Sequence, residues 1–187
     1  IVTYAGERAF AEILKGNYTY PGVMTKESYT PPRPDKEIND IPSPYLSGLM
    51  DSLVQPGKKY SAIIETNRGC PYSCTFCDQQ DLYYNKIAMF DYDRVIGEID
   101  WIVENKIEFL FFGDSNLGMF NRDVDFFRYI AKRRNETGYP RQIDYTTAKQ
   151  QPKRIVELGE ILNKEAKMRR GVTIALQSMN PKTLKAI

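Results

Sequence analysis

The chain has 187 residues, of which 42% are hydrophobic and 27% charged, and its formal net charge is +2 at neutral pH. This length fits one domain, or one domain with part of a second. No apolar run approaches the roughly 20 residues that span a bilayer, the small charge gives no sign of a nucleic-acid partner, and the absence of histidine excludes a Ser-His-Asp hydrolase.

Residues 1–16 predict a short strand, a turn and a helix. The apolar positions Phe10, Ile13 and Leu14 share one face of that helix. Residues 17–45 are rich in Pro, Tyr, Thr and charge, which predicts an extended linker because proline fixes φ and has no amide donor. Residues 45–54 can then form a short amphipathic helix.

From residue 60 onward, strand and helix patterns alternate, which is typical of parallel βα units. Strands are predicted at residues 60–65, 107–112, 142–147 and 171–176. Helices are predicted at residues 92–104 and 123–134, and two more begin at Pro152 and at Pro181. The basic clusters at residues 132–134 and 167–170 fall where helices should end, so we expect them to be solvated. Such units make up the first part of a barrel, in which functional groups collect where strands end.

All three cysteines, Cys70, Cys74 and Cys77, lie in the loop after the first of these strands. Thiolates at this spacing suit an iron–sulfur or zinc centre. Four protein ligands usually close a structural zinc site, and the chain has no histidine to serve as the fourth, so we expect one iron of a cluster to be left open. An odd number of clustered cysteines also favours a reducing cytoplasm over a disulfide framework.

The pattern Cys70-x-x-x-Cys74-x-Phe76-Cys77 resembles the signature of the radical S-adenosylmethionine (SAM) superfamily. The resemblance implies that the three thiolates hold three irons of a [4Fe–4S] cluster, while the amine and carboxylate of SAM chelate the fourth. An electron from the reduced cluster would then cleave SAM to a 5′-deoxyadenosyl radical. Phe76 would lie near the adenine, Asn67 and Arg68 would brace the loop, and the electron would come from a donor such as a flavodoxin or ferredoxin.

The resemblance also implies the fold, which is an α/β, partial (β/α) barrel of the radical SAM type, here truncated after about four βα units. Residues that directly follow predicted strands would then contact SAM. Asp114 would contact the amine of SAM, with Ser115 and Asn116 as alternatives. Lys149 would contact the carboxylate, and Gln177 with Ser178 would contact the ribose. Equally simple roles stay open, since an Asp can cap a turn, a Lys can be merely exposed, and the last pair can form a turn.

Residues 1–16 are similar to the end of the cobalamin-binding α/β domain that precedes the cluster domain in one radical SAM subgroup, with Gly6-Glu7 at the start of the helix. The expected domains are therefore a remnant of that domain (1–16), a Pro-rich linker with a short helix (17–59) and the N-terminal part of the barrel (60–187). Cobalamin would bind to a domain upstream, and the reaction would be methyl transfer or other radical chemistry. The substrate, a small molecule or a peptide, is not indicated.

Two further expectations remain. The rival interpretation is a metal-binding or electron-transfer module, in which the cysteines form a structural knuckle closed by a ligand from elsewhere, or are unrelated buried thiols. Residues 171–176 form an apolar run that needs partners on both edges, yet no later strand follows them. Since the chain also begins with Ile1, we expect it to be a piece of a longer protein, or to have that edge covered by another chain.

Overall fold

A computed structural model describes residues 1–3, 6–33, 37–72, 74–77, 87–148, 150–168 and 177–185. The chain divides into two compact units. The smaller unit consists of residues 1–41 and 69–88, and the larger one of residues 42–68 and 89–186. The predicted strand 171–176 lies outside the described residues. None of the helices in the described part of the chain has the length and apolar character needed to cross a bilayer.

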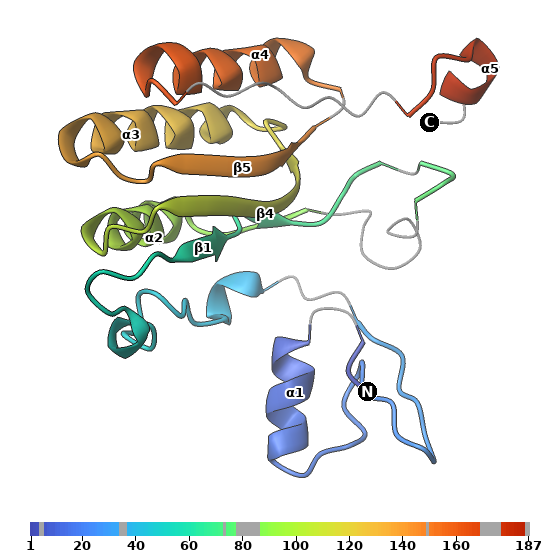
Figure 1. Cartoon of the computed structure of the whole chain (residues 1–187). Helices are drawn as coiled ribbons and strands as arrows, with labels where there is room; N and C mark the ends of the chain where they lie inside the picture. The colour runs from blue at the N-terminus through green and yellow to red at the C-terminus, as the bar shows by residue number, and fades with distance from the viewer. Residues whose placement is uncertain are drawn as a thin grey trace. The chain divides into compact units, whose positions relative to one another are not determined.

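The larger unit is built on a parallel sheet of three strands in the order β1-β4-β5 (Figure 1). These strands are β1 (Ser61–Ile64), β4 (Phe109–Leu117) and β5 (Gln142–Thr147). In the shared register Ile64 pairs with Phe112, and Phe112 pairs with Tyr145. The helices α2 (Tyr92–Glu104) and α3 (Asn121–Thr137) follow β1 and β4 along the chain. The predicted alternation of parallel strands and helices is therefore confirmed for this part of the chain.

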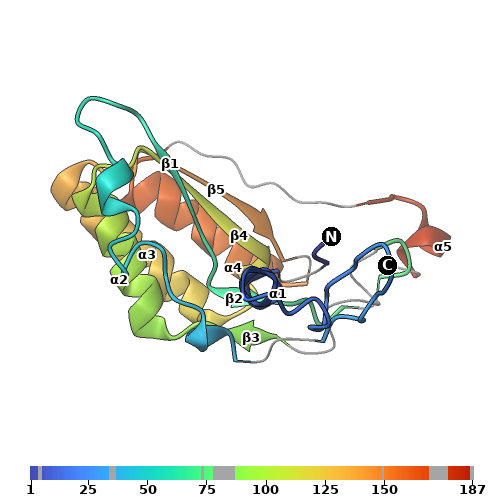
Figure 2. The same ribbon diagram turned by 90° about the horizontal axis from the view of Figure 1, so that it is seen from below.

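The two faces of the sheet differ in burial. Figure 2 shows α2 and α3 on the same side of the three strands. With β4 taken only as far as Phe112, the buried side chains of the sheet are those of Ala62, Ile64, Leu110, Phe112, Ile143 and Tyr145. Phe127 of α3 lies with its ring centroid 5.6 Å from that of Phe112 and 5.1 Å from that of Tyr145, and a fully buried side chain of this size contributes roughly 1.5–3 kcal/mol. Alternate residues face the other way, and Ile63 among them is 60% exposed.

β4 is longer than predicted. The residues Gly113 to Asn116 suggest a turn by composition, but the strand continues to Leu117, with a register shift between Phe112 and Leu117. Pairing of Leu117 with Thr147 of β5 holds this extension in the sheet. The prediction that the strand ends at Phe112 was wrong, because pairing with neighbouring strands outweighs local turn preference.

The helix after β5, α4 (Pro152–Glu160), begins at the predicted Pro152 and continues as a π-helical turn, η3 (Ile161–Glu165). Gly118 lies against α4 with φ 88°, and a Cβ there would lie 2.5 Å from Cδ1 of Ile155. The last helix is α5 (Pro181–Leu184), and the side chain of Asn180 caps it by accepting the amide of Lys182.

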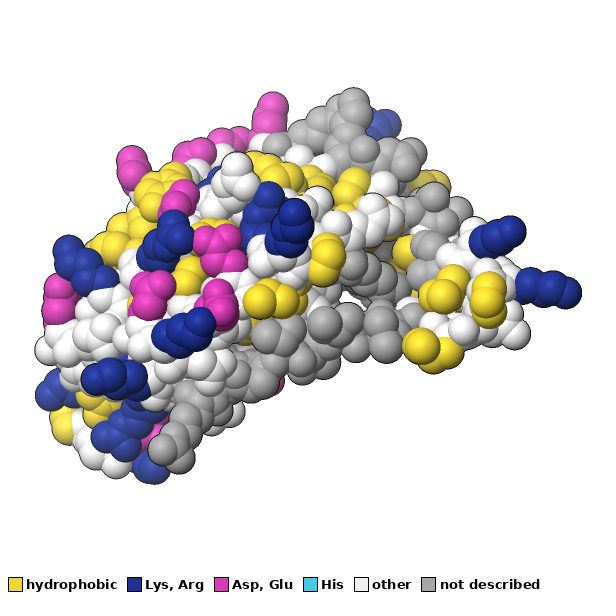
Figure 3. All heavy atoms as spheres, turned by 90° about the horizontal axis from the view of Figure 1, so that it is seen from above, with side chains coloured by type: hydrophobic (Ala, Val, Ile, Leu, Met, Phe, Trp, Pro, Cys, Tyr) yellow, Lys and Arg dark blue, Asp and Glu magenta, His cyan; other side chains and the backbone are white. Residues whose placement is uncertain are grey.

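The basic cluster at residues 132–134 lies near the end of α3, as predicted. Arg133 pairs with Asp100 at 2.8 Å, and Arg134 donates to the carbonyl of Ala166 at 2.9 Å. Basic and acidic side chains are interspersed on the face that Figure 3 shows. These arginines therefore stabilise helix ends and ion pairs.

The segment before β1 does not form the predicted amphipathic helix. Residues 45–54 contain turns and a short 3₁₀ helix, η2 (Asp51–Leu53). The Tyr45 ring packs against Trp101 with centroids 4.9 Å apart, and its hydroxyl group donates to the carbonyl of Ile63 and accepts its amide. These contacts with α2 and β1 determine the conformation of the segment, which is why helical periodicity alone gave the wrong prediction.

In the smaller unit, α1 (Glu7–Leu14) is the predicted helix. Of the strand expected before it, residues 1–3 are described, and they form one antiparallel bridge, between Val2 and Val23. Ala9 is the buried residue of the helix, whereas Phe10 and Leu14, on the predicted apolar face, are exposed. The bridge places Gly22 beside Ala9, so the turn packs on that side of the helix.

Residues 17–33 are folded rather than extended as predicted. A second antiparallel bridge joins Met24 to Tyr29, and Val23 is buried. The 3₁₀ helix η1 (Ile38–Asp40) follows, and Arg8 donates to the carbonyl of Glu37 at 2.8 Å. This stretch packs on α1 because Val23 and Ile38 supply apolar side chains among the prolines.

Candidate functional site

Two short segments frame the cysteine loop, and we call them the neck: residues 65–68, which lead into the loop, and residues 89–90, which lead out of it. They include β2 (Asn67–Arg68) and the end of β3 (Ala88–Met89), which form a two-stranded sheet. The amide of Phe90 donates to the carbonyl of Thr66 at 3.0 Å. This bond joins the two sides of the neck directly.

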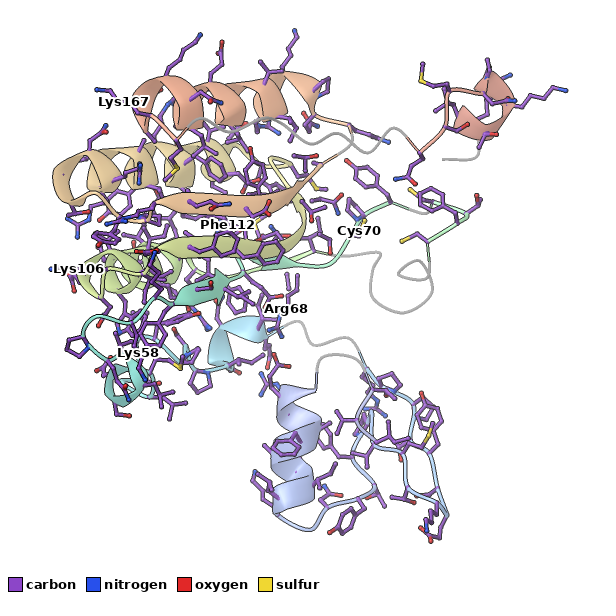
Figure 4. All side chains as sticks on the ribbon, viewed as in Figure 1. Lys58, Arg68, Cys70, Lys106, Phe112 and Lys167 are labelled. Carbon is purple, nitrogen blue, oxygen red and sulfur yellow. The ribbon has the colours of Figure 1, made fainter. Side chains whose placement is uncertain are left out.

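The Phe90 ring is the apolar centre of the neck. The guanidinium carbon of Arg68 lies 5.6 Å from the ring centroid, and that of Arg94 lies 4.3 Å from it. Arg68, which Figure 4 labels, also pairs with Glu65 at 2.6 Å. Cation–π contacts of this kind contribute about 0.5–1 kcal/mol each at exposed sites and more where they are desolvated. Arg68 therefore stabilises the neck, and its role in bracing the cluster loop stays a prediction.

Asp114 lies on β4 beside the same segment and is only 2% exposed. Its Oδ1 accepts hydrogen bonds from the amide of Thr66 at 3.1 Å, the hydroxyl of Thr66 at 2.5 Å, the amide of Asn67 at 3.0 Å and the side-chain amide of Asn67 at 2.6 Å. Its Oδ2 shares the amide of Thr66 at 3.1 Å. Burial raises the pKa of Asp114 to about 7, against the lowering effect of these hydrogen bonds.

Strand alternation explains why Asp114 is so deeply buried. It has the same parity in β4 as Leu110 and Phe112, whose side chains lie on the helix-covered face. Ser115 has the opposite parity and is partly exposed. Asn116 is buried at the end of the strand.

The other residues expected to contact SAM come after β5 and before α5. Lys149 lies outside the described residues. Gln177 is exposed with φ 63°, and the hydroxyl of Ser178 accepts the amide of Asn180 at 3.0 Å. The structure thus places the hydroxyl of Ser178 in the turn before α5, which is the simpler of its two predicted roles.

Within the cysteine loop, the amide of Cys77 donates to the carbonyl of Cys74 at 3.0 Å, which closes a tight turn. The cysteines form no disulfide; Cys74 is buried, and Cys70 and Cys77 are partly exposed. Burial raises the pKa of the Tyr72 hydroxyl, and the nearby Cys70 and Cys74 add to this effect. Phe76 is 52% exposed, so its ring is accessible at the surface of the loop.

The donor set fits an iron–sulfur cluster better than any other metal centre, since it offers three soft thiolates and no imidazole. In the described part of the chain, no three Cys, Asp or Glu side chains are gathered closely enough to hold a metal ion. Cluster assembly therefore requires the loop to bring its three sulfur atoms together.

Sequence reasoning missed Thr66 and Phe90. Both are buried, and a backbone hydrogen bond joins them, which leaves little trace in a sequence pattern. The register of the strands could have revealed Thr66. Ile64 pairs with Phe112, and Thr66 and Asp114 each lie two residues beyond these partners. A polar pair at such matched positions predicts a side-chain bond between the strand ends.

Comparisons with known proteins were made for the whole chain. The family model described as the Radical SAM superfamily matches residues 64–187. The chain is 36% identical to the 2-(S-pantetheinyl)-carbapenam-3-carboxylate methyltransferase of Streptantibioticus cattleyicolor and 35% identical to the cobalamin-dependent radical SAM methyltransferase TokK of Streptomyces tokunonensis. Each match covers 97% of this chain and 29% of the relative, so the chain spans less than a third of their length.

Two weaker similarities were also found. A hopanoid C-2 methylase of Rhodopseudomonas palustris is 28% identical over 49% of this chain and 18% of that protein. Among solved structures, the cobalamin-dependent SAM radical enzyme OxsB is 15% identical, with a TM-score of 0.44 over 74% of this chain and 20% of that one. The family assignment rests on the match to residues 64–187.

Proposed function

Because this chain belongs to the radical SAM superfamily, we propose that the protein containing it is a radical SAM enzyme whose Cys70, Cys74 and Cys77 bind a [4Fe–4S] cluster. The observation that carries the proposal is the family match over residues 64–187, which includes all three cysteines and Phe76 at the spacing of the superfamily signature. When bound, the reduced cluster supplies one electron to SAM and breaks its C5′–S bond, which gives methionine and a 5′-deoxyadenosyl radical.

The chain's own residues would bind and orient SAM. Phe76 is exposed enough to pack against adenine. The amine of SAM would be held at the end of β4 by Ser115, which is partly exposed, since Asn116 is buried and the carboxylate of Asp114 already accepts four donor groups. Lys149 remains the proposed partner of the SAM carboxylate, and Gln177 with Ser178 remain the proposed ribose contacts.

Methyl transfer with cobalamin is the reaction that the relatives favour. Two proteins that match 97% of this chain carry the name methyltransferase, and one of those names includes cobalamin. Because these alignments cover 97% of the chain, they include most of residues 1–63, which lie before the start of the family match at residue 64. The chain has no histidine, and we propose that cobalamin is held by an upstream domain, of which residues 1–16 are the end.

Further parts of the proposal follow from this chemistry. Residues 60–187 would form the N-terminal part of a partial barrel, completed by other parts of a longer protein. Cluster reduction needs an external donor such as a flavodoxin or ferredoxin, and the thiolates need a reducing, cytoplasmic environment.

The test is anaerobic reconstitution of the full-length protein with iron and sulfide, followed by electron paramagnetic resonance with and without SAM. We expect SAM to change the spectrum of the reduced cluster, because it binds the open iron. A cluster that is indifferent to SAM would instead support the electron-transfer module and overturn the proposal. Single Ala variants of Cys70, Cys74 and Cys77 should each lose cluster assembly in an iron assay, and full iron content in any of them would contradict the ligand assignment.

A further inference from the structure

We propose that Asp114 is a positioning residue, whose buried carboxylate fixes Thr66 and Asn67 and so sets where the cysteine loop begins. The proposal deepens the proposed function, on which it rests only in taking the loop as the place of the cluster. It assigns Asp114 a role different from direct contact with SAM.

The first argument is the convergence of hydrogen bonds. Both the backbone amide and the side chain of Thr66 donate to Asp114, and so do both of those of Asn67. The backbone and side-chain donor groups of two consecutive residues are thus all hydrogen-bonded to one carboxyl group. The side-chain amide of Asn67 also donates to the hydroxyl of Thr66 at 3.0 Å, which links the two residues to each other.

The second argument is that the hydrogen bonds at Thr66 connect Asp114 to both sides of the neck. Thr66 is held through its amide by Asp114 and through its carbonyl by the amide of Phe90. Phe90 is in turn held by Arg122, which donates to its carbonyl at 2.7 Å. Displacement of Thr66 therefore displaces both the segment that enters the loop and the segment that leaves it.

The third argument concerns access. Asp114 is 2% exposed, and its side chain lies on the helix-covered face of the sheet together with Phe112. A residue that holds the ammonium group of SAM needs an oxygen that a ligand can reach. The position and the bonding of Asp114 suit an internal anchor instead.

The consequence for the loop follows from chain connectivity. Only Arg68 and Gly69 separate the anchored Asn67 from Cys70. Gly69 has φ 114°, a backbone conformation that residues other than glycine rarely adopt. Fixing Asn67 therefore fixes the point at which the chain enters the loop. Such anchoring reduces the conformational entropy that is lost when the three sulfur atoms are gathered on a cluster.

The experiment compares Asp114→Ala with Asp114→Asn in the full-length protein. Amide hydrogen exchange is followed in the peptide that contains Thr66 and Asn67, in protein without iron, and bound iron is then measured after reconstitution. Asp114→Ala removes the acceptor of all four donors, so we expect exchange in this peptide to be at least about tenfold faster, which corresponds to the loss of one hydrogen bond to a charged group. We also expect a clear loss of bound iron. Asp114→Asn keeps an oxygen where the four donors meet, so both values should stay near wild type.

The conservative variant separates anchoring from SAM binding. If the charge of Asp114 holds the SAM amine, Asp114→Asn weakens SAM binding while cluster content and exchange stay unchanged in both variants, and the positioning role is overturned. Unchanged exchange in Asp114→Ala also overturns it. If the wild-type protein assembles no cluster, the proposed function fails, whereas the exchange data on iron-free protein still decide the role of Asp114.

Two further variants keep the test decisive. Asp123→Ala is the matched control, since Asp123 is equally buried but accepts the amides of Gly118 and Phe120 rather than those of Thr66 and Asn67. It should lower stability without faster exchange at Thr66 and Asn67. If Asp114→Ala does not fold, Thr66→Val is used instead. It removes the hydroxyl that donates to Asp114 and accepts the side-chain amide of Asn67, so it should accelerate exchange at Asn67 several-fold. Unchanged exchange there would refute the anchor.

Discussion

Replacing Tyr45 with Phe tests whether the segment before β1 protects the edge of the sheet. β1 is an edge strand of the described sheet, and Tyr45 covers that edge in the middle of the strand. Its hydroxyl donates to the carbonyl of Ile63 at 2.7 Å and accepts the amide of the same residue at 3.1 Å. Burial raises the pKa of this hydroxyl, so it remains protonated and able to donate. Phe keeps the ring that packs on Trp101 and removes only the hydroxyl group.

The expected loss of stability follows from two hydrogen bonds. Each contributes about 0.5–1.5 kcal/mol net, which gives a range of about 1–3 kcal/mol. Ile63 is 60% exposed, so water can partly replace the lost bonds and the lower half of that range applies. For a chain of this size the melting temperature changes by about 2–4 °C per kcal/mol. We therefore expect a decrease of about 2–8 °C.

The assay can use Trp101, the single tryptophan of the chain, as a fluorescent reporter of unfolding. Tyr60→Phe is the matched control, because the Tyr60 hydroxyl makes the same pair of bonds, to the amide of Gln55 and the carbonyl of Leu53, in an exposed turn. Tyr45→Phe should destabilise more than Tyr60→Phe and also associate more readily through the uncovered edge. Equal effects of the two variants would refute the protective role of Tyr45.

Two other predictions concern backbone strain and pH. Gly118→Ala should lower the free energy of unfolding by about 2–5 kcal/mol in a denaturant titration. The left-handed φ costs about 1–2 kcal/mol, and crowding of Ile155 adds about 1–3 kcal/mol. Gly57 has φ 79° but nothing within 4 Å of an added Cβ, so Gly57→Ala should show only the cost of the left-handed φ. The pKa of Asp114 is raised to about 7 from 3.8, so the folded protein holds a proton that the unfolded chain releases, and stability should fall as pH rises from about 4 to 7. Asp114→Asn should reduce this slope, and an unchanged slope would show that Asp114 does not titrate in that range.

The sequence predicted best those elements that local pattern determines. Helix α2 has the predicted bounds because its buried positions, among them Val95, Ile99 and Ile102, repeat with helical spacing. The strand β5 also has its predicted bounds. The family followed from the cysteine spacing, which the match over residues 64–187 supports.

Tertiary contacts decided the elements that were predicted wrongly. Residues 45–54 have helical periodicity, but their conformation depends on bonds from Tyr45 to β1, and no local pattern reveals these. Gly113 to Asn116 have turn composition, yet neighbouring strands keep them in β4. For Asp114, position after a strand predicted a ligand contact, whereas the parity that buries it depends on how far β4 extends.

The difference between the two faces of the sheet has a consequence for protein engineering. Folding depends on the helix-covered face, where Leu110, Phe112 and Ile143 are almost fully buried. The row formed by Ile63, Phe111 and Asp144 lies on the other face, and these residues are paired in register across all three strands. In the proposed barrel this row would face the interior, so a combinatorial library restricted to it would vary the lining of the barrel while it leaves the helix-covered core unaltered. Such libraries should retain a larger share of folded variants than libraries of equal size built at the buried positions.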